Sequence, residues 1–120
     1  MAKIILAEDE KILADFLEKK LKNEGYEVKV ARDGEEALKF LREEKPDLLL
    51  LDVIMPKKGG FEVLEEIRKD ENLKDLNVII ISNSGQPVEI NKAMELGVKD
   101  YIIKTEFDPL EVIEKVKKYI

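Results

Sequence analysis

Four consecutive leucines, Leu48 to Leu51, lead directly into an acidic residue, Asp52. A strand that is apolar at every position is typical of a parallel sheet covered by helices, because both of its faces are buried. Asp52 would then stand at the carboxyl end of this strand, the edge at which open α/β sheets bind their ligands. An aspartate at this position can also simply end a strand and begin a turn. The rest of the chain decides between these two interpretations.

Four other segments have the pattern of strands. Ile4–Ala7 is apolar like the leucine run, Val78–Ser82 is apolar up to its final serine, and Tyr101–Lys104 is a further short strand. In the segment 26–30, tyrosine and valines alternate with charged residues, so one face of this strand is expected to contact water. That pattern is typical of a strand at the edge of a sheet.

Apolar residues at helical spacing predict a helix after each strand. The predicted helices run from Lys11 to about Asn23, from Gly34 to about Lys45, from Phe61 to about Asp70, from the residue after Pro87 to Leu96 and from Pro109 to Ile120. Asp33 and Asp108 are suited to cap the amino ends of the second and fifth helices. Gly25 and Gly97 are suited to end the first and fourth in a left-handed conformation. The residues of the fourth helix expected to face inward are Ile90, Ala93, Met94 and Leu96.

Five strands alternating with five helices predict a parallel sheet with helices on both faces, because such units are joined by right-handed crossovers. The fully apolar strands belong at the centre and the alternating one at an edge, which fits the strand order 2-1-3-4-5. We therefore predict an α/β, flavodoxin-like doubly wound (βα)5 fold with a five-stranded parallel sheet. The 120 residues contain no linker, repeat or low-complexity segment, so residues 1–120 are expected to form a single domain.

The composition narrows the chemistry. The chain contains no cysteine and no histidine, which excludes disulfides, thiolate chemistry and imidazole ligands. Catalysis would have to use carboxylates, lysines, hydroxyl groups and a hard cation. The net charge of −6 argues against direct nucleic-acid binding, which needs a basic face. No apolar run approaches the roughly 18 residues of a membrane span, so we expect no membrane association and a cytoplasmic location.

Polar residues follow the strands and converge on one edge, because the carboxyl ends of parallel strands meet there. They are Glu8, Asp9, Asp52, Ser82 and Lys104. Taken singly, each has an ordinary explanation as a helix-terminal acid, a turn residue or a solvated lysine. Three crowded carboxylates repel one another and raise one another's pKa unless a cation lies between them. An all-oxygen site of this kind suits Mg²⁺ or Mn²⁺.

These residue types support phosphoryl transfer. A divalent metal neutralises and orients an incoming phosphoryl group, and a carboxylate can attack that group to form an aspartyl-phosphate. Asp52 is the best candidate nucleophile, because it lies on the central strand between the other groups. Lys104 would supply a cation, and the Ser82 hydroxyl a hydrogen-bond donor, to the phosphoryl oxygens.

Along its full length the sequence resembles the receiver domain of two-component response regulators. The resemblance is carried by Glu8–Asp9, Asp52, Met55–Pro56, Gly60, Ser82, Tyr101 and Lys104. It implies that Asp52 accepts a phosphoryl group from a histidine kinase or a phosphotransfer protein. It also implies that Asp9, Asp52 and the backbone carbonyl of Ile54 ligate Mg²⁺. Glu8 would assist the metal through a water molecule.

The resemblance further implies a conformational switch. Ser82 would move toward the phosphate while Tyr101 turns inward. The surface formed by the fourth helix, fifth strand and fifth helix would change, and would control a downstream protein of unknown identity. The domain is expected to be a monomer or a weak dimer.

Three positions bear on how closely the chain follows this family. Thr105 follows Lys104 where the family usually has a proline with a cis peptide; because a non-proline cis bond costs about 2.5–4 kcal/mol, a trans bond is expected. Asn83 stands where a small residue is typical, and the apolar Ile54 side chain would restrict the water that hydrolyses a phosphoryl group. If Thr105 and Asn83 impair switching, the chain would be a receiver-like protein-binding module that acts without phosphorylation.

Two other functions fit less well. A haloacid-dehalogenase-like phosphatase also uses an aspartate after a buried strand, but that family has a second acid two residues later, where this chain has Ile54. A flavodoxin-like cofactor protein would need a loop rich in Ser, Thr and Gly after the first strand. The acidic run Glu8–Glu10 would instead repel a phosphate.

Overall fold

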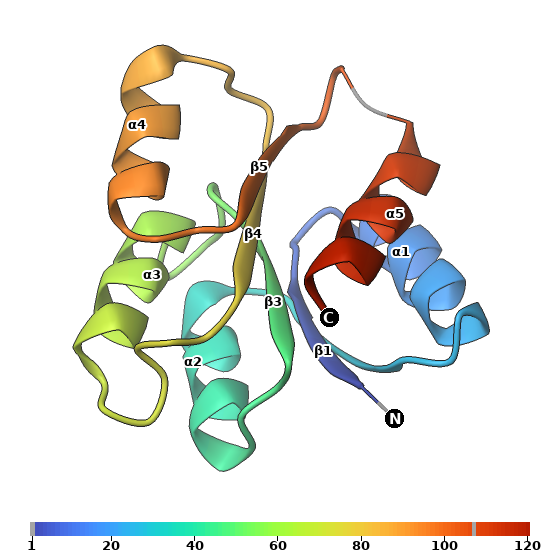
Figure 1. The fold of residues 1–120 in the computed structure, drawn as a ribbon, viewed down its shortest axis with the longest axis horizontal. Helices are drawn as coiled ribbons and strands as arrows, with labels where there is room; N and C mark the ends of the chain where they lie inside the picture. The colour runs from blue at the N-terminus through green and yellow to red at the C-terminus, as the bar shows by residue number, and fades with distance from the viewer. Residues whose placement is uncertain (1, 107) are drawn as a thin grey trace.

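A parallel sheet lies at the centre of the molecule (Figure 1). The computed structural model describes residues 2–106 and 108–120, and within them five strands form this sheet in the order β2-β1-β3-β4-β5. The strands are β1 (Lys3–Ala7), β2 (Glu27–Ala31), β3 (Leu48–Asp52), β4 (Val78–Ser82) and β5 (Asp100–Ile103). Every neighbouring pair is parallel. The predicted strand order and the flavodoxin-like α/β fold are confirmed.

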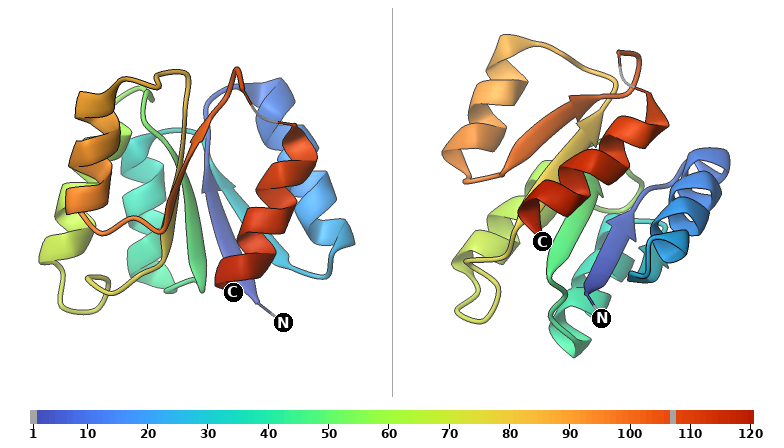
Figure 2. Two further views of the ribbon diagram at one scale, coloured as in Figure 1. Left: turned by 45° about the horizontal axis from the view of Figure 1, so that its top comes forward. Right: turned by 45° about the vertical axis from the view of Figure 1, so that its right-hand side comes forward.

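Helices cover both faces of the sheet (Figure 2). They are α1 (Lys11–Asn23), α2 (Gly34–Glu43), α3 (Gly60–Lys69), α4 (Pro87–Glu95) and α5 (Pro109–Tyr119). Helices α1 and α5 lie together on one face, and α2, α3 and α4 lie on the other. None of these helices, which include every helix in the described part of the chain, is long and apolar enough to span a bilayer.

The sheet separates two apolar cores. In β3, Leu49 and Leu51 pack on the side of α2 and α3, whereas Leu48 and Leu50 pack on the side of α1 and α5. All four leucines are completely buried. The leucine run is apolar at every position because successive side chains of this central strand enter different cores.

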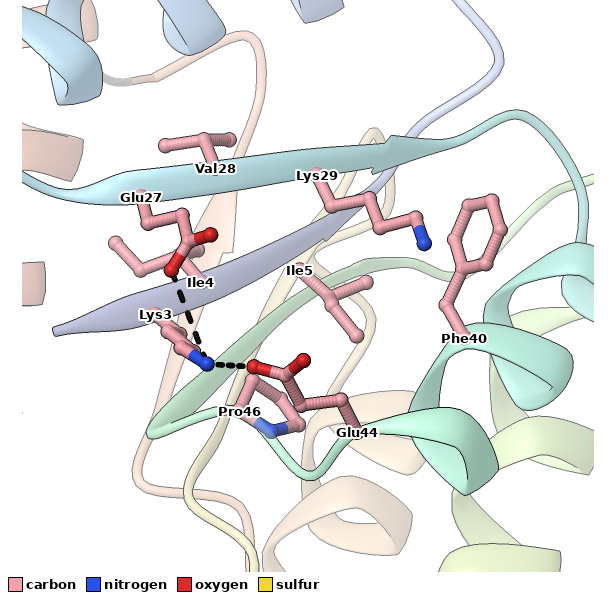
Figure 3. Close-up of a pocket in the computed structure, with 9 residues that line it drawn as sticks. All are labelled: Lys3, Ile4, Ile5, Glu27, Val28, Lys29, Phe40, Glu44 and Pro46. Atoms are coloured by element: carbon pink, nitrogen blue, oxygen red, sulfur yellow. Dashed lines mark ion pairs between the residues drawn. The ribbon is translucent and has the colours of Figure 1, made fainter.

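The edge strand β2 alternates between buried and exposed residues, as predicted. Val28 is buried, whereas Glu27 and Lys29 point to the other face and are exposed. A hollow of about 270 Å³ lies on this face, between α2 and the first residues of β1 and β2 (Figure 3). Across it Lys3 pairs with Glu27 at 3.9 Å, and the Lys29 amine lies 4.0 Å from the centre of the Phe40 ring. These charged edge residues discourage pairing with another strand.

The helix ends follow the predicted signals. Asp33 Oδ1 accepts a hydrogen bond from the Glu36 backbone N–H at 2.8 Å, and Asp108 caps α5 in the same manner through the N–H of Leu110. Gly25 and Gly97 have φ angles of +93° and +78°, the left-handed conformation expected after α1 and α4.

The prediction for the inner face of α4 is partly wrong. Ala93 is buried, but Met94 is 51% exposed, and Ile90 and Leu96 are only half-buried. Helix α4 lies over β5, a four-residue strand at the edge of the sheet, so little apolar surface is available beneath it. Periodicity identifies the apolar stripe of a helix but not how much of that stripe the sheet can cover.

Candidate functional site

The carboxyl ends of four strands bring the predicted site residues to one edge. Asp52 and Ser82 are the last residues of β3 and β4, while Glu8 and Lys104 directly follow β1 and β5. The Glu8 N–H donates to the Ala31 carbonyl at 3.0 Å, and the Lys104 N–H donates to the Ser82 carbonyl at 2.7 Å. The sheet's hydrogen bonding therefore extends to these two residues and fixes their backbones.

Burial distinguishes these side chains from ordinary surface charges. Glu8 is fully buried, and the exposed fractions of Asp52 and Ser82 are 4% and 1%. The Lys104 side chain is only 8% exposed. Asp9, in contrast, is exposed. Burying three ionisable groups in an otherwise apolar sheet is costly unless they neutralise one another or bind an ion.

The Lys104 amine lies among three carboxylates. Its Nζ atom is 2.8 Å from Glu8 Oε1 and 3.3 Å from Asp52 Oδ2. The shortest contact, 2.6 Å, is to Glu10 Oε2. Sequence reasoning placed Glu10 in the acidic run but did not identify it as a site residue. Its contact with Lys104 joins residues 94 positions apart, which no local pattern reveals.

The surroundings shift the proton equilibria of the two central groups. Burial raises the pKa of Asp52 to about 8, and the hydrogen bond and charge of Glu8 add to this increase, while Lys104 partly opposes it. For Lys104, burial works against the charged form, but the hydrogen bond to Glu10 and the nearby carboxylates of Glu8 and Asp52 outweigh burial and raise its pKa. The lysine is therefore a permanent cation, and Asp52 needs further positive charge to ionise fully at neutral pH.

The acidic cluster has the donor set of a hard cation. Glu8, Asp9 and Asp52 each offer a carboxylate oxygen, and these oxygens lie within 4.8 Å of one another. Among the described residues, no donor is aligned to hydrogen-bond the buried Glu8 Oε1, although Lys104 lies near it. Exposed Asp9 leaves one side open to water. Oxygen ligands with room for water fit Mg²⁺ or Mn²⁺.

The loop after β3 shapes the site from the side of α3. The Ile54 N–H donates to Asp52 Oδ1 at 3.3 Å, and the Ile54 side chain is 69% exposed beside it. A Cβ atom on Gly60 would lie 2.3 Å from the Asp52 carbonyl oxygen, so only glycine lets α3 begin this close to the strand end. The metal-ligand role of the Ile54 carbonyl stays a prediction.

Ser82 and Tyr101 are connected through Ser84, a loop residue that the sequence did not single out. Ser82 Oγ accepts a hydrogen bond from the Ser84 N–H at 3.1 Å, and the Tyr101 hydroxyl donates to the Ser84 carbonyl at 2.8 Å. Tyr101 is half-buried against the core beneath α4. Burial also raises the pKa of its hydroxyl. The two predicted switch residues thus share one backbone contact at the start of the β4–α4 loop.

Two of the three departures from the family pattern, Thr105 and Asn83, lie on the open side of Lys104. The Lys104–Thr105 peptide is trans, as predicted, and both Thr105 and Asn83 are exposed. They line a hollow of about 750 Å³ together with Glu10, Lys11, Ile12, Leu13, Phe16, Lys104 and Pro109. Ile12 is 88% exposed there. The wall beside the acidic cluster is therefore largely apolar.

Known proteins are similar to this chain in sequence and fold over nearly its whole length. Residues 4–117 match the family profile of the response regulator receiver domain. The chain is 35% identical to the response regulator TrrA of Thermotoga maritima, solved in complex with Mg²⁺ and BeF, with full coverage of both chains and a TM-score of 0.86. It is 30% identical to a Francisella response regulator receiver domain (99% and 96% covered, TM-score 0.91). It is 29% identical to the Mn²⁺-bound response regulator Rcp1 (99% and 94% covered, TM-score 0.88).

Proposed function

Because the chain belongs to the response regulator receiver domain family, we propose that it is a phosphorylation-dependent switch whose phosphoryl acceptor is Asp52. The observation that carries this proposal is the position of the Lys104 amine, 3.3 Å from Asp52 Oδ2 at the edge where Glu8 and Asp9 also gather. A buried carboxylate with a fixed cation beside it is suited to receive an anionic group.

The acidic cluster would hold Mg²⁺, with Mn²⁺ as a substitute. Asp9, Asp52 and the Ile54 carbonyl would be ligands, and Glu8 would act through water. The metal supplies positive charge that favours ionised Asp52 and neutralises the phosphoryl oxygens. Two relatives support this assignment, since TrrA was solved with Mg²⁺ and BeF and Rcp1 with Mn²⁺.

On the side of this chain, the chemical step uses Asp52, Lys104 and Ser82. An Asp52 carboxylate oxygen attacks the phosphorus of a phosphohistidine, the P–N bond breaks, and the imidazole leaves and takes up a proton. Lys104 donates to a phosphoryl oxygen as charge develops, and the Ser82 hydroxyl donates to another. The donor would be a histidine kinase or a phosphotransfer protein. Exposed Ile12 and Phe16 beside Lys104 offer it an apolar surface to contact.

The output would arise from a shift in the population of two conformations. A phosphoryl group adds about −1.5 to −2 charges and binds better to the arrangement in which Ser82 and Lys104 face it. Only this difference in affinity can move the equilibrium. Because Ser84 links Ser82 to Tyr101, movement of Ser82 would release or redirect the aromatic ring. The surface of α4, β5 and α5 would then present a changed shape to a downstream protein.

Intact mass spectrometry tests the proposal. The protein is incubated with Mg²⁺ and a small acyl- or amido-phosphate, beside an Asp52→Asn variant and a sample with the metal chelated. A single phosphoryl adduct is expected in the wild type alone. A folded wild-type protein that forms no adduct would contradict the proposal and favour a binding module that acts without phosphorylation.

A further inference from the structure

We propose that Glu10 is a positioning residue that holds the Lys104 amine while Asp52 is unmodified and yields it to the phosphoryl group. The inference rests on the proposed function of Asp52. It assigns a role to a carboxylate that belongs neither to the metal cluster nor to the acceptor. Glu10 acts on the chemistry only through Lys104.

Glu10 stands at the amino end of α1, but its side chain does not cap that helix. Glu10 is the N-cap residue of that helix, a position where Ser, Thr, Asp and Asn are preferred because their short side chains bond the free N–H groups. Within the described residues, the Glu10 side chain makes no capping hydrogen bond. It instead extends across the site to Lys104, 94 residues away in sequence.

The contacts of Lys104 explain why one of them must be given up. An ammonium group has three N–H donors, and three carboxylates, those of Glu8, Glu10 and Asp52, lie 2.6–3.3 Å from Nζ. Among the described residues, the contact with Glu10 is the one that is aligned as a hydrogen bond, so Glu10 fixes the orientation of the amine. To donate an aligned hydrogen bond to a phosphoryl oxygen on Asp52, the amine must turn away from Glu10.

Exposure identifies Glu10 as the partner that Lys104 leaves. The Glu8 side chain is fully buried, so losing the lysine would leave its charge without a partner, whereas the Asp52 carboxylate is itself converted when the phosphoryl group is bonded to it. The Glu10 side chain is 56% exposed, and water can solvate its carboxylate when Lys104 departs. Exchange of Glu10 for a phosphoryl oxygen is therefore the least costly rearrangement.

This exchange makes Glu10 a competitor of the phosphoryl group. Every interaction that Lys104 makes with Glu10 in the unmodified state must be lost on phosphorylation, which lowers the affinity for the modified state. Removing the contact should strengthen binding of a phosphoryl analogue. It should not strengthen binding of the metal, which does not bind Lys104.

Titration calorimetry with two probes separates these effects. Mg²⁺ alone is titrated first, and beryllium fluoride is then titrated in the presence of saturating Mg²⁺. Glu10→Gln should bind beryllium fluoride about two- to fivefold more tightly than the wild type, the effect expected for one partly exposed ion pair. Its Mg²⁺ affinity should not increase.

Two further variants show whether the affinity for beryllium fluoride depends on the contact between Glu10 and Lys104 or only on the charge of Glu10. Glu10→Asp keeps the charge but has a shorter side chain suited to capping α1, so it should also bind beryllium fluoride more tightly. Glu106→Gln removes the same charge two residues beyond Lys104, where Glu106 is exposed, and should change the affinity less than Glu10→Gln does.

Each outcome bears on a different claim. If the wild type with Mg²⁺ does not bind beryllium fluoride, both the proposed function and this inference are wrong. If the wild type binds beryllium fluoride and both Glu10 variants bind it with the same affinity as the wild type, the role of Glu10 is wrong but the proposed function stands. The same conclusion follows if Glu10→Asp matches the wild type and Glu10→Gln changes the affinity no more than Glu106→Gln does. Thermal unfolding of each variant checks that it is folded, since Glu10 is exposed and its replacement should leave the fold intact.

Discussion

The two helices that follow the central strands β3 and β4 are anchored very differently. On the β3–α3 side (Leu48–Lys69), α3 buries four residues, Gly60, Val63, Leu64 and Ile67. On the β4–α4 side (Val78–Glu95), α4 buries Ala93 alone among its residues, all of which the structure describes. Both sides end at the same edge of the sheet and each supplies one central residue of the site, Asp52 or Ser82.

The anchoring of α4 is concentrated at its carboxyl end. Arg68, near the end of α3, donates from Nε to the Leu96 carbonyl at 2.6 Å and from Nη2 to the Gly97 carbonyl at 3.2 Å. It also donates to the carbonyls of Lys74 and Leu76, so one guanidinium joins three segments. The first turn of α4 includes exposed Pro87 and Val88. Asp52, the proposed acceptor, thus lies on the side whose helix is well buried, and Ser82 leads into the side whose helix is less buried.

Core truncation should give the largest difference between the two sides. Ile67→Ala removes a fully buried side chain from α3 and should lower the free energy of unfolding by about 2–5 kcal/mol. Met94→Ala in α4 removes a side chain that is 51% exposed and should change it by about 0.5 kcal/mol or less. Urea titration measures both values, and similar losses would mean that α4 is packed as firmly as α3.

A matched pair of glycines probes the backbone on each side. A Cβ on Gly60 would lie 2.3 Å from the Asp52 carbonyl oxygen, so Gly60→Ala must displace the end of β3 and should cost about 1–3 kcal/mol. A Cβ on Gly85 would lie 2.7 Å from Ile103 Cδ1, the end of a flexible side chain, and Gly85→Ala should cost less.

The same pair should differ in phosphorylation. Gly60→Ala should also slow adduct formation at Asp52, measured by intact mass against time, because it moves the acceptor. Gly85→Ala should leave the rate close to that of the wild type. A Gly60→Ala protein with unchanged rate and stability would show that the strand end adapts without cost.

Loss of the Arg68 contacts should loosen α4 without loosening α3. The shorter glutamine side chain of Arg68→Gln cannot donate to all four carbonyls that Arg68 binds. The substitution should therefore lower the free energy of unfolding by roughly 1–2 kcal/mol. Hydrogen exchange should accelerate at Leu96 and Val98, whose amides donate to carbonyls of α4, more than at Leu64 and Ile67. Equal acceleration in both helices would indicate global destabilisation instead.

The acceptor side should also respond to pH. The pKa of Asp52 is about 8 in the folded protein and about 3.9 in an unfolded chain. The folded state therefore binds the proton more tightly, and this group lowers the stability of the metal-free protein as pH rises from about 4 to 8. Asp52→Asn removes that loss, so its stability relative to the wild type should rise by several kcal/mol between pH 5 and pH 8.

Ser82→Ala is the control for this titration, because it changes the β4–α4 side without removing an ionisable group. Its effect on stability should be independent of pH over the same range. Thermal or urea unfolding at several pH values, without divalent metal, provides the measurement. A constant difference between Asp52→Asn and the wild type would contradict the raised pKa.

The sequence predicted most of what depends on burial and strand order. The leucine run placed Asp52 on a central strand because only a strand with two covered faces can be apolar throughout. The same reasoning brought Glu8, Ser82 and Lys104 to one edge. Caps at Asp33 and Asp108 followed from local hydrogen bonding alone.

What the sequence did not predict depends on distances between segments far apart in the chain. Met94 has the periodicity of a core residue, but the length of β5 decides how much of α4 is covered. Glu10 and Arg68 resemble ordinary surface charges, and their roles become visible only when Lys104 or the end of α4 is placed beside them. Ser84 has no distinguishing pattern at all.

The assembly of the site from four strands has a consequence for when the protein can act during its lifetime. Glu8, Asp52, Ser82 and Lys104 come from segments that span nearly the whole chain, and each is oriented by the pairing of its strand. A strand shifted by one residue would turn its site residue to the opposite face. An incompletely folded or newly synthesised chain therefore has acidic residues but no acceptor site. Under the proposed function, competence for phosphorylation should appear only when the last strand, β5, has joined the sheet, and it would then report completed folding.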